Sequence, residues 1–321
     1  MLGGRAGPGP GQGTRPRVDS MATLAAPSRA RRLEADPGQL APTAPAAATP
    51  AWASCYIRAV TDPISGQLRR AAPQQADPFA TWCHLRRELG PRVTVIDLYQ
   101  LVADGRGLRA EELTRFEREL LSERALDFVW PHREIEPGTD RVHEPILVTT
   151  YDPGWPDLFV GWRAQLRAAL GAAARRIDHI GSTAVPGLDA KAVIDIQVSV
   201  DRIEDEASYR PGLEGCHLRM RSRDDLHRYF RPALGRPRKV QVHVCQVGGA
   251  WERDHLLLRD FLRASETARV SYAGTKRAAA ARWRDDRIAY TEAKTAVILD
   301  TLEAAEAWAS SCGWSVIGPS I

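Results

Sequence analysis

The sequence predicts an α/β protein in which the strands of one sheet are combined with helices and a helical segment closes the chain. Between residues 145 and 247, short segments rich in valine and isoleucine recur between turn-forming residues, which is typical of β-strands. Apolar residues between 155 and 170 return at helical spacing, and residues 251–309 are almost wholly helical in pattern. Together these patterns indicate a sheet with attached helices.

Composition narrows the class of protein before any motif is considered. The 321 residues are 44% apolar, which is enough to bury a core. No run approaches the roughly 18 apolar residues of a membrane-spanning helix, so we expect no membrane association. Five cysteines are widely spaced without a CxxC pair, which favours reduced thiols and a cytoplasmic location over zinc binding or disulfides.

The positive net charge does not indicate a nucleic-acid partner. Residues 1–78 hold nine arginines and five acidic residues, which accounts for the whole formal charge of +4. The rest of the chain carries 35 basic and 35 acidic residues, so its charge is balanced and the case for nucleic acid is weak. Only four basic residues are lysines, which makes the lysine positions candidates for specific contacts: Lys191, Lys239, Lys276 and Lys294.

The beginning of the chain is expected to be a disordered leader over residues 1–92. Gly, Pro, Ala and Arg dominate residues 1–78 without a sustained period of 2 or 3.6, so this part cannot bury enough surface to offset its ordering entropy. An alternative is a gene-model extension, because plausible starts exist at Met21 and near Val93.

Residues 93–144 are predicted to form a helical hairpin. One apolar face contains Ile96, Tyr99 and Val102, and residues 105–107 turn the chain. The second face is predicted to contain Leu113, Phe116 and Leu120.

The main domain is predicted from residue 145 to 311, with residues 312–321 as a tail. A strand over 145–151 stops at the turn signal Asp152-Pro153-Gly154, and a helix then runs to Gly171. Further strands are expected at 177–180, 192–200, 228–232 and 240–247, followed by the C-terminal helices.

One string in this domain resembles a known family. Residues 179–198 read HIGSTAVPGLDAKAVIDIQV, which is similar to the GrpB (UPF0157) pattern of a His-x-Gly-Ser-Thr loop, a Val-Pro-Gly-Leu turn and an Ala-Lys-x-x-Ile-Asp-Ile strand. The likeness continues through residues 151–155, 259–263, 272–276 and 287–294. It implies a nucleotidyltransferase-like mixed sheet flanked by helices, with a C-terminal helical segment.

The resemblance also implies which residues form a site. In the nucleotidyltransferase-fold superfamily, a Gly-Ser loop holds nucleotide phosphates and nearby carboxylates hold a divalent metal. The loop residues here are Gly181, Ser182 and Thr183, and Asp195 stands at the first metal position. The expected phosphate or carboxylate contacts are Lys191, Arg259, Lys276 and Lys294, with the last two alternatively lying on solvated helix faces. Lys191 is also a catalytic candidate.

The other carboxylates of such a site are missing. Gln197 shares its strand face with Asp195, and the neighbouring strand offers Gln241 and His243. Mg²⁺ prefers carboxylate oxygens, so a softer ion or no metal fits better than a two-metal site. His243 is a metal ligand, a general base or a hydrogen-bonded strand residue, and the sequence leaves these open.

Two functions follow from the resemblance. The first is nucleotidyl transfer, with a nucleotide such as ATP and Mg²⁺ or Mn²⁺. The alternative is a catalytically degenerate module that binds a phosphorylated small molecule or a partner protein. The chain has no GxxxxGK[ST] phosphate loop, so it cannot act as a dephospho-coenzyme A kinase by the usual means.

Overall fold

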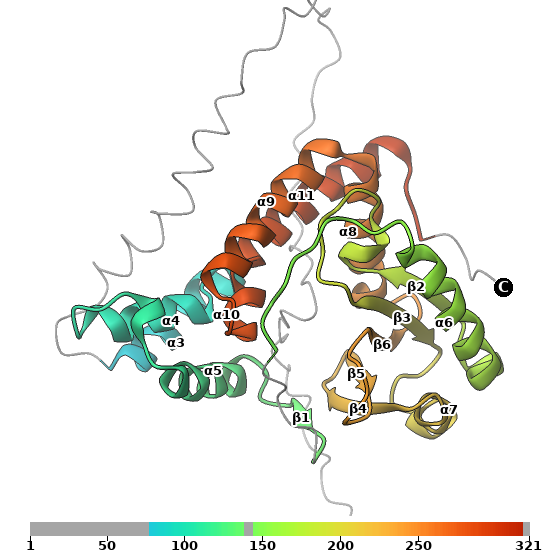
Figure 1. Cartoon of the computed structure of the whole chain (residues 1–321), viewed down its shortest axis with the longest axis horizontal. Coiled ribbons are helices and arrows are strands. Elements are labelled where there is room, and N and C mark those ends of the chain that lie inside the picture. The colour runs from blue at the N-terminus through green and yellow to red at the C-terminus, as the bar shows by residue number, and fades with distance from the viewer. Residues whose placement is uncertain (1–76, 138–143, 317–321) are drawn as a thin grey trace, which may run out of the picture.

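A mixed six-stranded sheet forms the centre of the molecule (Figure 1). The structure, a computed structural model, describes residues 77–137 and 144–316. The strand order is β1-β4-β5-β6-β3-β2, in which β3 and β6 run parallel and the other neighbours run antiparallel. The strands are β1 (Glu134–Ile135), β2 (Arg176–Ile180), β3 (Ile194–Val200), β4 (Leu218–Arg223), β5 (His227–Pro232) and β6 (Val240–Gln246).

The predicted fold class is confirmed, and four of the five predicted strands are present. The exception is the segment 145–151, which forms no regular strand. Its Thr149 makes a single antiparallel bridge to Ala190, with both N–H···O bonds at 2.9 Å, and Ile146 donates its N–H to the carbonyl of Arg284. The segment is extended because it crosses from one layer of the structure to the next. The unpredicted strand β4 alternates Leu218 and Met220 with arginines, which hid its apolar face.

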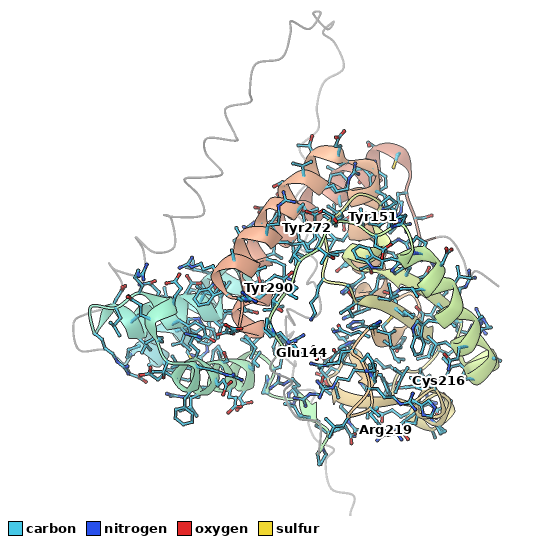
Figure 2. The ribbon with its side chains drawn as sticks, viewed as in Figure 1. Glu144, Tyr151, Cys216, Arg219, Tyr272 and Tyr290 are labelled. Atoms are coloured by element: carbon cyan, nitrogen blue, oxygen red, sulfur yellow. The ribbon has the colours of Figure 1, made fainter. Side chains whose placement is uncertain are left out.

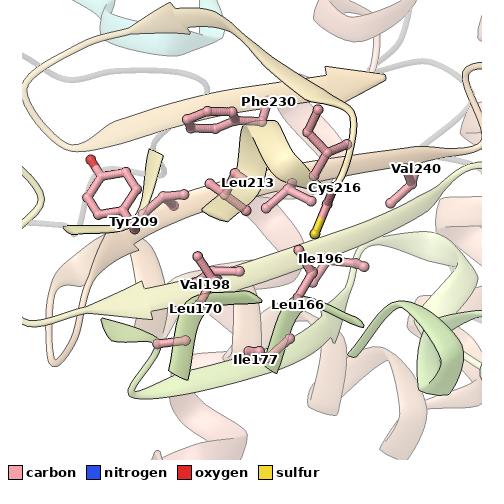
Figure 3. Packing of buried hydrophobic residues seen from close by; sticks show 14 of the residues in the cluster. Leu166, Leu170, Ile177, Ile196, Val198, Tyr209, Leu213, Cys216, Phe230 and Val240 are labelled. Carbon is pink, nitrogen blue, oxygen red and sulfur yellow. The ribbon is translucent and has the colours of Figure 1, made fainter. Parts of the chain in front are cut away.

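One face of the sheet carries the main apolar core. Because side chains alternate along a strand, Ile194, Ile196 and Val198 of β3 all point to this face. There they pack against α6 (Trp155–Leu170) and α7 (Arg210–Gly215), as Figure 3 shows for Leu166 and Leu213. The opposite face of β3 carries Asp195 and Gln197, so the same alternation supplies the polar residues of the site.

Helices from the end of the chain lie on the other side, and the first of them contacts the sheet. They are α8 (Ala250–Ala264), α9 (Glu266–Arg282), α10 (Arg287–Glu292) and α11 (Thr295–Cys312). Trp251 of α8 packs with Ile180 and Cys245 of the sheet, and α8 also contacts α9 and α11 (Figure 1). No helix within the two described ranges is long and apolar enough to cross a bilayer.

A second apolar cluster joins the first helices of the described chain to the last ones. Helices α3 (Pro78–Leu89), α4 (Val95–Asp104) and α5 (Arg115–Val129) pack with the C-terminal end of α9 and with α10. Trp82 is 1% exposed and donates its indole N–H to the carbonyl of Thr94 at 2.7 Å. Residues 77–92 therefore do not belong to a disordered leader, since Trp82, Cys83 and Leu85 are buried in this cluster. The remainder of the predicted leader, 1–76, lies outside the described residues.

The second predicted face of the hairpin was wrong in part, because Leu113 is buried at 2% exposure but the other two members are not. Phe116 and Leu120 are 69% and 46% exposed, whereas Ser122 and Ala125 of the same helix are buried. Helix α5 is instead oriented with Ala125 in the second apolar cluster and with Ser122 lining the cleft described below.

Candidate anion-binding cleft

A cleft of about 450 Å³ opens between the polar face of the sheet, helix α5 and the C-terminal helices. Tyr290 of α10 and Glu144 of the crossing segment, both labelled in Figure 2, line it from different elements. Six of the predicted site residues line this cleft: Ser182, Thr183, Lys191, Asp195, Lys276 and Lys294. They come from the short 3-10 turn η4 (Ser182–Ala184), the loop before β3, β3 itself, α9 and the start of α11.

Gly181 allows the loop and the carboxylate of Asp195 to meet. The chain leaves β2 with a φ of 70° at Gly181, a conformation that non-glycine residues adopt at a cost. A Cβ atom at this position would lie 2.5 Å from Oδ2 of Asp195. The contact is set by the sheet register, in which Ile180 of β2 pairs with Asp195 of β3. Because Gly181 lacks a Cβ atom, the loop can lie in contact with Asp195.

Thr183 and His179 anchor the loop rather than offer free groups to a ligand. Thr183 donates its hydroxyl proton to the carbonyl of Val193 at 3.1 Å, so Nε2 of His179, 3.0 Å away, must donate to Thr183. Burial lowers the pKa of His179 to about 4, which keeps its ring neutral. These bonds connect the end of β2 to the start of β3 and fix the loop that carries Ser182.

Three of the four lysines in the chain converge on the cleft. Lys276 is only 2% exposed, and its Nζ donates to the carbonyl of Asp189 at 2.6 Å. Lys294 lies with its Nζ 4.4 Å from the ring centre of Tyr290, and Lys191 is half-buried on the loop before β3. Lys276 and Lys294 therefore do not form a solvated helix face. Their helices turn these positions inward.

Burial weakens the protonation of all three lysines. It lowers the pKa of Lys276 to about 7 and the pKa values of Lys191 and Lys294 to about 8. The positive charge of Lys294 contributes to the shift at Lys276, whereas the carboxylate of Asp195 opposes the shift at all three. One carboxylate is thus shared by three ammonium groups, and the local charge is positive whenever the lysines are protonated.

The cleft lining also contains arginines that the sequence analysis did not assign to the site. Arg238 and Arg287 line the cleft and make no ion pair within the described part of the chain. Burial, together with the charge of Arg238, lowers the pKa of Arg287. The cleft lining contains ten cationic and five acidic side chains, an excess of five positive charges. The cations are Arg115, Arg118, Arg133, Lys191, Arg221, Arg231, Arg238, Lys276, Arg287 and Lys294, and the acids are Glu119, Glu144, Asp195, Asp285 and Asp286.

These arginines come from α5, β4, β5, α10 and the two loops that carry Arg133 and Arg238, so no short sequence window contains the cluster. The only signal in the sequence is the preference for arginine over lysine, which is general in this chain and therefore does not single them out.

Arg259 lies outside the cleft lining, in contrast to its predicted role as a ligand contact. Its Nε donates to Asp260 at 2.7 Å, and its terminal nitrogen donates to the carbonyl of His179 at 3.2 Å and lies 3.7 Å from Asp178. The guanidinium therefore fastens α8 to the end of β2. It acts on the site only by holding the strand that leads into Gly181.

His243 lies behind Asp195 and is a hydrogen-bonded strand residue. Its Nδ1 is 2.9 Å from Nε2 of His227, and its Nε2 is 3.8 Å from Oδ1 of Asp195. The ring is stacked between Tyr229 and Trp251. His243 does not line the cleft, so it reaches a ligand only through Asp195.

The donor atoms around Asp195 do not fit a Mg²⁺ or Mn²⁺ site. Gln197 shares the strand face of Asp195, but its side chain is fully buried and does not line the cleft. Neither of its amide atoms has a hydrogen-bond partner among the residues that the structure describes. It cannot provide the second ligand, contrary to its predicted place on a metal-facing surface. Gln241 is the register partner of Asp195 and is the neutral neighbour that lines the cleft. Within 77–137 and 144–316 no three His, Cys, Asp or Glu residues are grouped as metal ligands.

The fold and the cleft together define a mixed α/β protein with a cationic pocket where β2 ends and β3 begins. The family model described as GrpB protein matches residues 145–304. UPF0157 protein BH1888 of Halalkalibacterium halodurans is 38% identical over 181 residues, covering 54% of this chain and 90% of the relative. UPF0157 protein SCO7215 of Streptomyces coelicolor is 38% identical over 154 residues, covering 48% of this chain and 81% of the relative. The chain belongs to the GrpB (UPF0157) family.

Two further similarities concern a longer protein and a solved structure. Dephospho-CoA kinase of Mycobacterium leprae is 32% identical over 231 residues, which cover 61% of this chain and 56% of that protein. The crystal structure of the conserved protein GrpB from Enterococcus faecalis is 28% identical, with a TM-score of 0.45, covering 50% of this chain and 99% of that one.

Proposed function

We propose that the cleft binds a phosphorylated small molecule, with a nucleotide such as ATP as the class to test first. The observation that carries this proposal is the convergence of Lys191, Lys276 and Lys294 around Ser182 and Asp195. A phosphate group accepts hydrogen bonds from several cationic donors at once, and ammonium groups can neutralise its charge without a metal ion. The cytoplasm, where nucleotides are abundant, is the expected location.

The depressed lysine pKa values support a ligand that is an anion. A buried ammonium group lacks much of its hydration, so the lysines lose protons more readily than in water. A bound phosphate would supply the missing stabilisation and raise the pKa values again. Because Lys276 has a pKa of about 7, phosphate binding near neutral pH is expected to take up protons.

Nucleotidyl transfer is the second candidate function. The contact between Gly181 and Asp195 favours it, because this contact places one carboxylate directly beside the loop of Ser182. The absence of further carboxylates around Asp195 within the described residues favours binding without turnover, or a reaction in which lysines take the place of a metal. Several relatives of the family segment carry the name dephospho-CoA kinase, but the phosphate loop that this step usually needs is not in the present chain.

Calorimetric titration with ATP, pyrophosphate and inorganic phosphate tests the proposal, each in Mg²⁺ and in EDTA. We expect binding in both conditions, and about a tenfold or greater loss in Lys294→Met, since a hydrogen bond to a charged group contributes about 1.5–3 kcal/mol. Lys239→Met is the matched control because it removes the same charge from an exposed position outside the cleft. Absence of binding for all three ligands would refute the proposal and leave a protein partner as the alternative.

Incubation with ATP and analysis of the nucleotide products separates the two candidates. Release of pyrophosphate that depends on Asp195 would support nucleotidyl transfer, and intact ATP with retained binding would support the module without turnover.

A further inference from the structure

A line of four side chains runs from the cleft into the interior on the polar face of the sheet. Asp195 lies at the cleft, with Oδ1 3.8 Å from Nε2 of His243. Nδ1 of His243 is 2.9 Å from Nε2 of His227, and Nδ1 of His227 is 3.7 Å from Oδ2 of Asp224. Two carboxylates therefore bracket two histidines that are hydrogen-bonded to each other.

The surroundings hold both imidazole rings in place. His227 is 5% exposed and lies nearly parallel to Trp251, with an angle of 7° between the rings. His255 is on Trp251 too, with 3.6 Å between ring centres, and its Nδ1 is bonded to the carbonyl of Trp251. The titratable or charged groups that face the pair are Asp224, from the β4–β5 turn, Arg228 and Tyr229 of β5, Asp195 of β3 and His255 of α8.

Counting protons shows that the two neutral histidines have two possible tautomeric arrangements. Two neutral imidazoles carry one N–H each, and one of these must occupy the bond between His227 and His243. The other can point at only one of the two carboxylates. In one arrangement, Nδ1–H of His227 points at Asp224 and the lone pair on Nε2 of His243 faces Asp195. In the other, Nε2–H of His243 points at Asp195 and the lone pair on Nδ1 of His227 faces Asp224. A single additional proton would satisfy both ends at once.

The two ends are not equivalent. The side chain of Asp224 is 16% exposed and that of Asp195 is 30% exposed, so water screens Asp224 less. The charge of Asp195 is also compensated by three lysines. Asp224 should therefore attract the N–H more strongly, and we expect both His227 and His243 to carry their proton on Nδ1 when the pair is neutral.

We propose that Asp224, His227 and His243 form a proton relay that ends at Asp195 and regulates the charge that Asp195 presents to the cleft. The three are positioning residues, since none of them lines the cleft. A proton that leaves a ligand for Asp195 passes to Nε2 of His243, and the proton on Nδ1 of His243 passes to Nε2 of His227. Burial lowers the pKa of His227 and so opposes the charge that it then carries, whereas the adjacent carboxylate of Asp224 favours that charge. The sequence conserves protons and charge and returns Asp195 as a carboxylate.

Only the role of the relay in ligand binding rests on the proposed function. If the cleft holds a phosphorylated molecule with a hydroxyl or an acidic phosphate, the relay makes ligand binding proton-linked and gives Asp195 the role of a base. The hydrogen-bond pattern itself is a property of the protein without a ligand, so it can be tested separately.

The test is Asp224→Asn with ¹⁵N-histidine NMR, which reports the protonated nitrogen of each ring. Oδ1 of Asp224 accepts the N–H of Leu226 at 2.9 Å, and the asparagine oxygen can keep this bond. The new NH₂ group then replaces Oδ2 and faces Nδ1 of His227 as a donor. His227 must therefore place its proton on Nε2 and donate to His243, which places its own proton on Nε2.

We expect a change from Nδ1–H to Nε2–H in both rings of the ligand-free full-length protein at pH 8. Asp225→Asn is the control, because Asp225 is the exposed neighbour of Asp224 and is not part of the line. His255 provides an internal reference, because its Nδ1–H stays bonded to Trp251 in every variant. The relay is refuted if His243 keeps its tautomer in Asp224→Asn, or if the parent already carries Nε2–H on both rings. If the parent binds none of ATP, pyrophosphate and phosphate but the tautomer change occurs, the proposed function is refuted and the relay stands.

Discussion

The replacement Lys276→Met gives a sharp test of the buried lysines. Lys276 is 2% exposed, and burial and the neighbouring charge of Lys294 lower its pKa from 10.5 to about 7. Methionine has a similar length and no charge, so it removes the titration while preserving most of the packing. It also removes the hydrogen bond to Asp189, a loss that does not depend on pH between 7 and 10.

The direction in which pH changes the free energy of unfolding follows from the protons bound by the folded and the unfolded chain. Between pH 7 and pH 10 the unfolded chain keeps a proton on Lys276 that the folded protein has lost, so the free energy of unfolding rises with pH. The destabilisation is fully present below the folded pKa of about 7 and is relieved as the pH approaches the unfolded value of 10.5. Over the interval from pH 7 to pH 10 this residue contributes a rise of roughly 3 kcal/mol. The variant lacks this contribution.

Guanidinium denaturation followed by tryptophan fluorescence at several pH values measures the effect. The difference in unfolding free energy between parent and Lys276→Met should change by roughly 3 kcal/mol from pH 7 to pH 10 in favour of the parent. Lys239→Met should follow the parent, since Lys239 is exposed. Parallel curves for the parent and Lys276→Met would show that Lys276 keeps its ordinary pKa, and the physical case for an anion in the cleft would fail.

Two further substitutions test the geometry around the cleft and the packing of α3. Gly181→Ala should lower the unfolding free energy by about 2 kcal/mol or more, because the φ of 70° and the contact at 2.5 Å from Oδ2 of Asp195 both oppose a Cβ atom. Part of this loss should disappear in an Asp195→Ala background, and an unchanged loss would mean that the carboxylate does not press on the loop. Trp82→Ala should cost about 3–5 kcal/mol, because the indole is 1% exposed. A loss below about 1 kcal/mol in denaturation would contradict the packing of α3 on α4 and α5.

The periodicity of the sequence was sufficient to predict most strands, because a sheet places successive side chains of a strand on opposite faces. On β3, Ile194, Ile196 and Val198 mark one face and Asp195 marks the other, so a local pattern predicts both a core and a polar surface. The rarity of lysine was also informative, since three of the four lysines line one cleft. Their convergence could not be derived, because the register of sheet and helices brings them together.

Long-range packing decided the features that the sequence analysis missed. Arg259 has a guanidinium group that suits a phosphate contact, but this group is paired with the carboxylates of Asp178 and Asp260 and lies outside the cleft lining. Gln197 has the right parity for a metal-facing residue, yet beside its register partner His243 it is fully buried. The alternation of side chains along a strand therefore predicts the face on which a residue lies, whereas its burial on that face depends on the elements that cover it.

The stability of the domain is distributed unequally between the two faces of β3, and this asymmetry is an argument for a functional site. The apolar face is complete, with Ile196 and Val198 fully buried against α6 and α7. The polar face concentrates unfavourable features, namely buried lysines, the unpartnered amide of Gln197 and the glycine with positive φ. Each of these lowers stability, and none improves packing. Local conflicts of this kind are tolerated where a ligand or a reaction requires them, so their coincidence at one cleft supports a binding role more strongly than any single residue does.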